Sequence, residues 1–126
     1  MIMASRKIEF ALEFIAEGIS RMATPDQIYD QAVDRRDAGD KPGAIELLIE
    51  ALLIDPDFAI GHGMIAKLYA DLGEVEKAIE HAKRVVELEP EDTFSYTALS
   101  VIYVKCGRIP EAEAAKAIAF QREHGL

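Results

Sequence analysis

Three glycines recur at one fixed spacing along the chain and divide its sequence into similar units. Gly39, Gly73 and Gly107 lie 34 residues apart, and an alanine follows each of them five residues later. A period of this length is typical of one helix-turn-helix unit in a stacked helical array. Because such a unit cannot bury its apolar face alone, we expect the units to stack into a solenoid whose concave surface carries the function.

Composition and charge exclude several classes of protein. Half of the 126 residues are hydrophobic, which is too many for an intrinsically disordered chain. The formal net charge of −9 argues against nucleic acid and anionic membrane surfaces as partners. No apolar run approaches the ~20 residues of a membrane-spanning helix, and the N-terminus does not resemble a secretory signal. Cys106 is the single cysteine, so we expect a reducing compartment and, by default, the cytoplasm.

Turn and cap residues divide each unit into two helices, here called the A helix and the B helix. The A helices are expected near residues 25–38, 58–72 and 93–106, and the B helices near residues 41–54, 75–88 and 109–123. Each A helix ends just before its glycine, which suits a left-handed cap, and Pro42 and Pro110 suit the first turns of B helices. Thr24, Pro25 and Gln27 predict a capping box. No segment shows the sustained alternation of a strand, so the chain is predicted to be all-α.

Small side chains occupy the positions where paired helices meet. Ala32, Ala66 and Ser100 recur on the A helices, opposite Ala44, Ala78 and Ala112 on the B helices. Two helices joined by a short turn approach closely only where their contact residues are small. We therefore expect a close seam inside each hairpin. The wider gaps between helices are predicted to be filled by Ile65, Tyr69, Leu99 and Tyr103.

Residues 1–24 carry the pattern of a separate amphipathic helix. One of its faces collects apolar side chains, namely Ile8, Ala11, Leu12, Ile15, Ile19 and Met22. The charged residues Lys7, Glu9, Glu13 and Glu17 lie elsewhere on the helix. We interpret this helix as a cap, because the terminal repeats of a solenoid need protection from solvent. Alternatively, it is exchanged with a second molecule, or it occupies the concave surface as a removable plug.

When the three units are aligned at the 34-residue period, residues 25–126 resemble the tetratricopeptide repeat family. The second unit carries the resemblance best, through Ile65-Ala66-Lys67-Leu68-Tyr69, Gly73, Ala78-Ile79 and Glu87-Leu88-Glu89-Pro90. The resemblance implies a right-handed α-solenoid of three repeats, 25–58, 59–92 and 93–126. Gln31, Arg35, His62 and Lys116 stand where the family usually has large apolar or aromatic residues. We therefore expect the first A helix and the last B helix to be less deeply buried.

The resemblance also implies that the A helices line a concave groove that binds a partner. The groove-facing set is Tyr29, Val33, Arg36, Ile60, Gly63, Met64, Lys67, Phe94, Thr97, Val101 and Lys105. One subset of the family clamps the C-terminal carboxylate of heat-shock chaperones with Lys and Asn side chains. Tyr29, Val33 and Met64 take those places here, so this binding mode is not expected. The apolar strip beside several cations instead suits an extended or helical segment with apolar anchors and mixed charge.

The same residues allow a plainer interpretation, in which they pack between repeats or are covered by another copy of the chain. Gly61 and Gly63 also have two possible interpretations. They mark either a frayed helix start or a place where a ligand backbone approaches closely. Each glycine costs roughly 1 kcal/mol relative to alanine inside a helix.

No pattern in the sequence indicates catalysis. His62, His81 and His124 are not spaced as ligands, Cys106 has no second thiol, and carboxylates two apart point away from each other on a helix. We therefore expect no catalytic residues, no metal and no cofactor. His62 is expected to pack between helices.

Three functions are compatible with these features. The first is a protein-binding adaptor or scaffold that holds a partner segment in the groove. The second is self-assembly into a homo-oligomer through the N-terminal helix or the alanine-rich, uncapped last helix. The third is a helper of an enzyme or electron carrier, whose acidic surface steers a basic partner.

Overall fold

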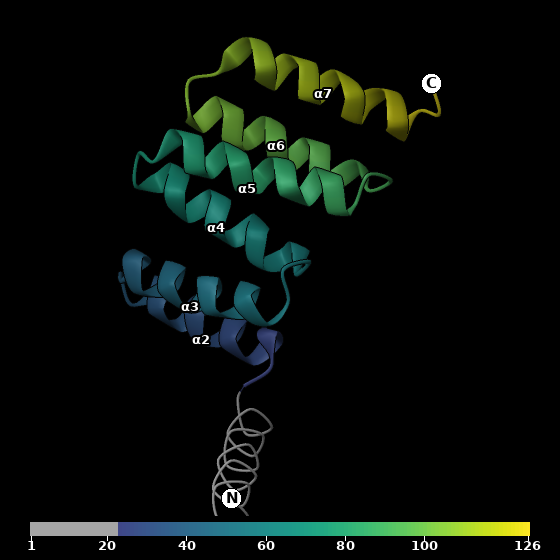
Figure 1. The fold of residues 1–126 in the computed structure, drawn as a ribbon. Coiled ribbons are helices and arrows are strands. Elements are labelled where there is room, and N and C mark those ends of the chain that lie inside the picture. Colours follow the sequence, from purple (N-terminus) through teal and green to yellow (C-terminus); the bar gives the residue numbers. More distant parts are fainter. Residues whose placement is uncertain (1–22) are drawn as a thin grey trace, which may run out of the picture.

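The computed structural model describes residues 23–126, which form six helices and no strand (Figure 1). The helices are α2 (Pro25–Asp37), α3 (Lys41–Ile54), α4 (Ala59–Asp71), α5 (Val75–Leu88), α6 (Thr93–Lys105) and α7 (Ile109–Glu123). Their bounds agree with the predicted A and B helices to within one residue, so the all-α prediction is confirmed. The helix predicted within residues 1–24 lies outside the described residues.

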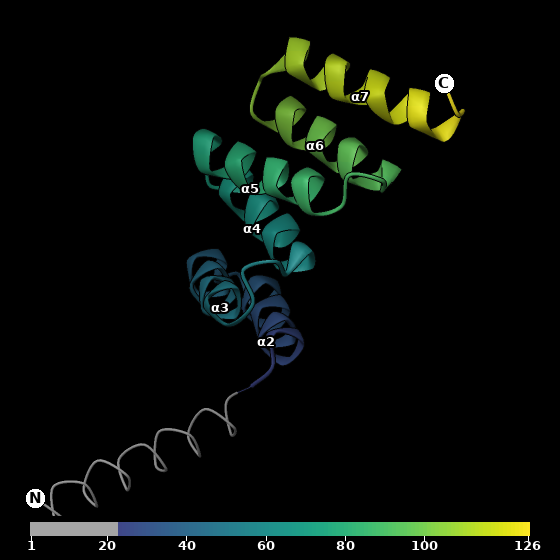
Figure 2. The ribbon, with the colours of Figure 1, turned by 45° about the vertical axis from the view of Figure 1, so that its right-hand side comes forward.

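The helices stack as three antiparallel hairpins along one direction. The pairs are α2 with α3, α4 with α5, and α6 with α7, and they follow one another in chain order (Figures 1 and 2). Each hairpin joins the next through a B helix that packs on the following A helix, and α4 also packs on α6. None of the helices in the described part of the chain is long and apolar enough to cross a membrane.

The three repeated glycines end the A helices. Gly39, Gly73 and Gly107 have φ angles of 86°, 78° and 73°, in the left-handed region that favours glycine. After each of them, the next backbone N–H donates to a carbonyl five residues earlier, for example Glu74 to Tyr69 at 2.9 Å. This bond satisfies a carbonyl that the end of the helix leaves unpaired. The predicted left-handed caps are confirmed.

The start of α2 is also as predicted. The Thr24 side chain accepts from the Gln27 backbone N–H at 3.3 Å, while the Gln27 side chain accepts from the Thr24 N–H at 3.0 Å. This is the expected capping box, with Pro25 in the first turn. Asp40 caps α3 by accepting from the Gly43 N–H at 2.9 Å. The pKa of the Asp40 carboxyl lies below its usual value because of this bond and the neighbouring Arg35.

The interior consists of two buried clusters that meet at α4. One joins the first hairpin to α4 through Ala32, Ala44, Ile45, Leu48, Met64, Ile65 and Leu68. The other joins the second and third hairpins through Ala66, Ala78, Ile79, Ala82, Leu99, Ile102, Tyr103, Ala112 and Ala115. Tyr69 packs against both clusters. α4 is therefore the central element of the fold.

The small-residue seams predicted inside the hairpins are present. Ala32, Ala44 and Ala78 are 0 % exposed. Ser100 takes the place of alanine in the third hairpin, and its buried hydroxyl donates to the Ala112 carbonyl at 3.0 Å. Because the hydroxyl is paired across the seam, its burial leaves no donor unsatisfied.

Candidate functional site

Three hollows follow one another along the face formed by the A helices. The first, of about 270 Å³, is lined by Tyr29, Arg36, Ala59, Ile60, Gly63, Met64, Lys67, Val85 and Glu89. The middle hollow, of about 340 Å³, is lined by Gly63, Ala66, Lys67, Ala82, Val85, Phe94, Thr97, Ala98, Val101 and Ile102. The third, of about 360 Å³, is lined by Thr97, Ser100, Val101, Val104, Lys105, Glu113 and Lys116. Neighbouring hollows share lining residues, so we treat them as one groove.

The structure brings ten of the eleven predicted groove residues into these hollows. The exception is Val33, which packs against the buried cluster of the first hairpin. Met64 lines the first hollow but is only 6 % exposed, because it also belongs to that cluster. Whether the ten residues bind a partner stays a prediction. Their common position supplies the surface that such binding needs.

Large apolar side chains stand exposed in the groove. Phe94 is 79 % exposed, Ile60 58 % and Val101 47 %. Ile60 and Phe94 lie in the first turns of α4 and α6, one repeat apart, so they form a row across neighbouring A helices. Exposed apolar side chains that gather in a concavity are typical of surfaces that bind other molecules.

Basic side chains also line the groove, although the formal net charge of the whole chain is −9. Arg36, Lys67 and Lys105 come from α2, α4 and α6 respectively. Arg36 pairs with Asp37 at 3.0 Å, and Lys105 pairs with Asp71 at 3.1 Å. Among the described residues, Lys67 has no ion-pair partner. Its ammonium is therefore available to an acidic group of a ligand.

The two glycines near the start of α4 have different surroundings. A Cβ atom on Gly61 would lie 2.7 Å from Cδ2 of Phe58, so the packing of that ring excludes a side chain. A Cβ atom on Gly63 would meet only Val85, at 3.9 Å. Both residues lie inside α4, within its first two turns. Internal packing explains why residue 61 is a glycine. The space beside Gly63, in contrast, opens into the first and middle hollows.

A sequence model of the family described as Tetratricopeptide repeat matches residues 35–100, just over half of the chain. The chain belongs to the tetratricopeptide repeat family. The resemblance carried by the 34-residue period is thereby confirmed, and the repeat solenoid with it. A search of curated proteins returned no match.

Solved tetratricopeptide repeat structures share this fold. Two structures of MamA have a TM-score of 0.72 and 22% identity and cover 80% and 81% of this chain. The chain in turn spans 55% and 60% of those MamA chains. The translocator chaperone SycD of Yersinia enterocolitica type III secretion has a TM-score of 0.69 and 14% identity, with 78% of this chain and 74% of SycD covered.

The second TPR of Spaghetti (RPAP3) was solved with the HSP90 peptide SRMEEVD bound. Its TM-score is 0.69 at 15% identity, and the match covers 82% of this chain and 96% of that one. At these identities the likeness establishes the fold alone.

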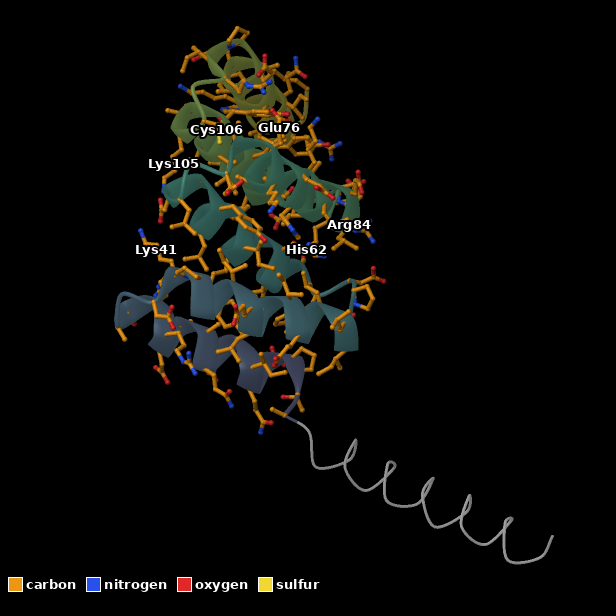
Figure 3. The ribbon with its side chains drawn as sticks, turned by 60° about the vertical axis from the view of Figure 1, so that its left-hand side comes forward. Lys41, His62, Glu76, Arg84, Lys105 and Cys106 are labelled. Carbon is orange, nitrogen blue, oxygen red and sulfur yellow. The ribbon has the colours of Figure 1, made fainter. Side chains whose placement is uncertain are left out.

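The face away from the groove holds a histidine pair that sequence reasoning missed. His62 on α4 and His81 on α5 bring their Nδ1 atoms to 2.9 Å, and Nε2 of His62 lies 2.8 Å from the Pro56 carbonyl. A carbonyl only accepts, so His62 donates through Nε2 and its Nδ1 accepts the Nδ1–H of His81. The expected burial of His62 between helices is confirmed, since it is 8 % exposed. His62 and Arg84 lie on one side of the array in Figure 3, with Lys41 and Lys105 on the other.

Spacing along a single helix does not reveal this pair. Histidines three or four apart face each other on one helix, whereas His62 and His81 meet across the two helices of one hairpin. Burial and the neighbouring His62 lower the pKa of His81, and Glu80 acts in the opposite direction. No group of three His, Cys, Asp or Glu side chains that could hold a metal ion occurs among residues 23–126.

Cys106 lies at the end of α6 and is half-buried. Its burial raises the pKa of the thiol, an effect that Arg108 opposes and Glu76 reinforces. The thiol therefore stays protonated near neutral pH and lacks the thiolate character of a nucleophile. Figure 3 places Cys106 and Glu76 near the top of the array, away from His62.

Proposed function

We propose that the chain is a non-catalytic protein-interaction adaptor that holds a segment of a partner protein in the groove of α2, α4 and α6. The observation that carries this proposal is the row of exposed apolar side chains, with Phe94 at 79 % and Ile60 at 58 % exposure. Such side chains gain most when a partner removes them from water. SycD is a chaperone and the Spaghetti repeat binds a peptide, which supports a polypeptide as the class of ligand.

The groove suggests the chemistry of the partner segment. Two apolar side chains would fill the first and middle hollows, where Ile60 and Phe94 form part of the walls. A carboxylate beside them would meet the ammonium of Lys67, which pairs with no acidic side chain among residues 23–126. A helix or an extended strand can present such a pattern. The carboxylate-clamp mode is not part of this proposal, because Tyr29 and Met64 occupy two of its positions.

The test is affinity capture from the native host with matched variants. Phe94→Glu places a charge in the middle hollow, and Leu53→Glu makes the same change at an α3 position of equal exposure, 79 %, outside the three hollows. We expect a partner held by the wild type and by Leu53→Glu to be lost by Phe94→Glu. Removal of an interface anchor typically costs about 2–4 kcal/mol, or about 30- to 1,000-fold in affinity.

The capture experiment has two outcomes that oppose the proposal. A partner that survives Phe94→Glu binds elsewhere on the array. A partner lost equally with Leu53→Glu responds to charge or to folding and not to the groove. Circular dichroism of both variants checks that the helices are intact.

We propose self-assembly as the second candidate function, because apolar side chains are exposed on α7 and just after it. Ile118 is 38 % exposed, Phe120 55 % and Leu126 81 %. A helix face that carries such residues favours association with another copy. Light scattering at increasing concentration tests it: a mass that rises for the wild type and stays monomeric for Phe120→Glu supports this function, and a monomer throughout opposes it.

A further inference from the structure

We infer that the middle hollow is an anchor site, which takes one aromatic side chain of the partner with one carboxylate close to it in the same segment. This inference rests on the function proposed above and names the chemistry that the groove selects. Three features of the hollow support it: its small lining residues, the exposed ring of Phe94, and a single charge on Lys67.

Small residues leave the middle hollow open. Three of its lining residues come from α4, α5 and α6 respectively, namely Gly63, Ala82 and Ala98. The same positions 34 residues earlier hold large side chains that pack in the buried cluster of the first hairpin, namely Tyr29, Leu48 and Met64. At this register the first junction between hairpins is occupied by its own side chains. The next junction instead keeps a hollow of about 340 Å³, although α6 packs on both α4 and α5.

The size and the walls of the hollow suit one large, flat side chain. Its volume lies near the lower end of the range for small-molecule pockets, about 300–1,000 Å³, so it suits a side chain better than a whole cofactor-sized molecule. The Phe94 ring beside it is 79 % exposed. Aromatic rings pack on one another edge-on or offset, and aromatic anchors in pockets dominate many interfaces. An aromatic side chain in the hollow would cover the Phe94 ring.

The charge of the hollow comes from one residue. Lys67 is the only charged residue among those that line it in the described part of the chain. The corresponding positions of α2 and α6 hold Val33 and Val101, so this charge does not belong to the repeat pattern. The neighbouring hollows contain charges of both signs, with Glu89 in the first and Glu113 in the third. A carboxylate is therefore matched at the middle hollow and opposed on either side of it.

Burial and charge contribute different amounts to binding. Lys67 is exposed, and an ion pair at an exposed site changes affinity by only about two- to fivefold. Removal of a buried anchor changes it by about 30- to 1,000-fold. The net charge of −9 also repels a run of acidic residues. We therefore expect the aromatic residue to supply most of the affinity and a single carboxylate to supply selectivity.

Selection from a phage library of random dodecapeptides on the immobilised full-length chain tests the inference. We expect the enriched peptides to share one aromatic residue, with one Asp or Glu within about one helical turn of it and no run of acidic residues. A synthetic copy of the enriched peptide, labelled with fluorescein, then gives dissociation constants by fluorescence anisotropy.

Variants that fill the hollow test where the peptide binds. Ala98→Leu introduces a side chain similar in size to Met64, its counterpart one repeat earlier. We expect Ala98→Leu to bind the peptide at least about thirtyfold more weakly. Ala117→Leu makes the same change at an exposed alanine of α7 outside the three hollows and should bind as the wild type does. If circular dichroism shows that Ala98→Leu folds poorly, Thr97→Leu fills the hollow from an exposed position.

A charge exchange tests the role of Lys67. Lys67→Glu should weaken binding about fivefold, and a peptide with Lys in place of its acidic residue should recover that loss in Lys67→Glu. The matched control is Lys83→Glu on α5. Lys83 is exposed, lines none of the three hollows and pairs with no acidic side chain within residues 23–126.

Several results would overturn the inference. They are the absence of enrichment, enriched peptides without an aromatic residue, and enriched peptides with a basic residue in place of the acidic one. Equal effects of Ala98→Leu and Ala117→Leu on binding would also overturn it. Sedimentation of the wild type and of Ala98→Leu identifies another occupant, because a dimer that dissociates in Ala98→Leu would place a second copy in the hollow.

These experiments separate the inference from the proposed function. A partner lost by Phe94→Glu in the capture experiment, together with peptides that lack the pattern, would keep the proposed function and remove the anchor chemistry. Peptides that carry the pattern and bind in the hollow, together with a captured partner that survives Phe94→Glu, would keep the anchor site and remove the function proposed for the groove.

Discussion

The paired imidazoles of His62 and His81 fix the hydrogen-bonding arrangement inside one hairpin. His62 donates through Nε2 to the Pro56 carbonyl and accepts at Nδ1 from His81, so these bonds assign one tautomer to His62. The surrounding charged groups are Glu80, Lys77, Arg84 and Glu87 on α5 and Asp57 before α4, which pairs with Arg84. Burial and the neighbouring His62 disfavour the charged form of His81.

This pair makes stability depend on pH. Burial holds the pKa of His81 below the ordinary value of 6.5. Below pH 6.5 the unfolded chain therefore binds a proton at His81 more readily than the folded chain does. The contribution of neutral His81 to the free energy of unfolding is complete above pH 6.5 and declines as the pH falls from there through the folded pKa. We expect the free energy of unfolding of the wild type to decrease on acidification, by at most about 1.4 kcal/mol per pH unit for this proton.

Urea unfolding between about pH 7.5 and pH 5 measures this decrease, in a range that spans the ordinary histidine pKa. His81→Phe keeps a ring against Tyr69, which now stacks on His81 at 5.9 Å between centroids, and should flatten the dependence. His124→Gln changes an exposed histidine just after α7 and should retain the wild-type slope. If the free energy of unfolding changes with pH equally in the wild type and in His81→Phe, His81 does not cause the pH dependence.

At the scale of one helix, α4 contains two glycines with opposite expected effects. In Gly61→Ala the new methyl group would lie 2.7 Å from Phe58, whose ring packs edge-on against Tyr29, so we expect a loss of about 1–3 kcal/mol from overpacking. In Gly63→Ala the methyl group has room, and alanine favours a helix by about 1 kcal/mol over glycine. Chemical denaturation of both variants measures the difference.

The same pair of variants also tests the role of Gly63 in the groove. If a ligand backbone approaches α4 there, Gly63→Ala should weaken partner binding although it stabilises the fold. Destabilisation by Gly63→Ala would contradict the space seen around this residue. Unchanged binding by a stabilised Gly63→Ala protein would remove Gly63 from the binding surface.

Helices and their caps could be predicted from the sequence because local residues determine them. A left-handed glycine, a proline in the first turn and the Thr24–Gln27 box act over a few residues, so their effect does not depend on the rest of the fold. The His62–His81 contact and the burial of Met64 depend on how hairpins sit against one another. The family resemblance predicted the groove-facing positions, but it did not distinguish Met64, which the core covers, from Phe94, which stays exposed.

At the scale of the whole molecule, ion pairs connect all three hairpins. Asp71 on α4 lies 3.5 Å from Lys41 on α3 and 3.1 Å from Lys105 on α6. The hydrogen bond from Lys105 is the main cause of the lowered pKa of Asp71, so its contribution to stability is present above pH 3.8 and is lost as the pH falls through the folded pKa. These side chains are 34–43 % exposed, and ion pairs at such exposure contribute about 0–1 kcal/mol each.

If the stack is held by buried seams and not by surface charge, two substitutions should differ in their cost. Ala78→Leu enlarges a side chain that is 0 % exposed in the seam of the central hairpin, so we expect a loss of about 1–3 kcal/mol. Asp71→Asn removes the charge shared by three hairpins, and we expect a loss of under about 1 kcal/mol that shrinks further in high salt. Urea unfolding at low and high ionic strength compares them. A larger cost for Asp71→Asn, abolished by salt, would mean that electrostatic contacts hold the hairpins in line, and the groove would then change shape with ionic strength.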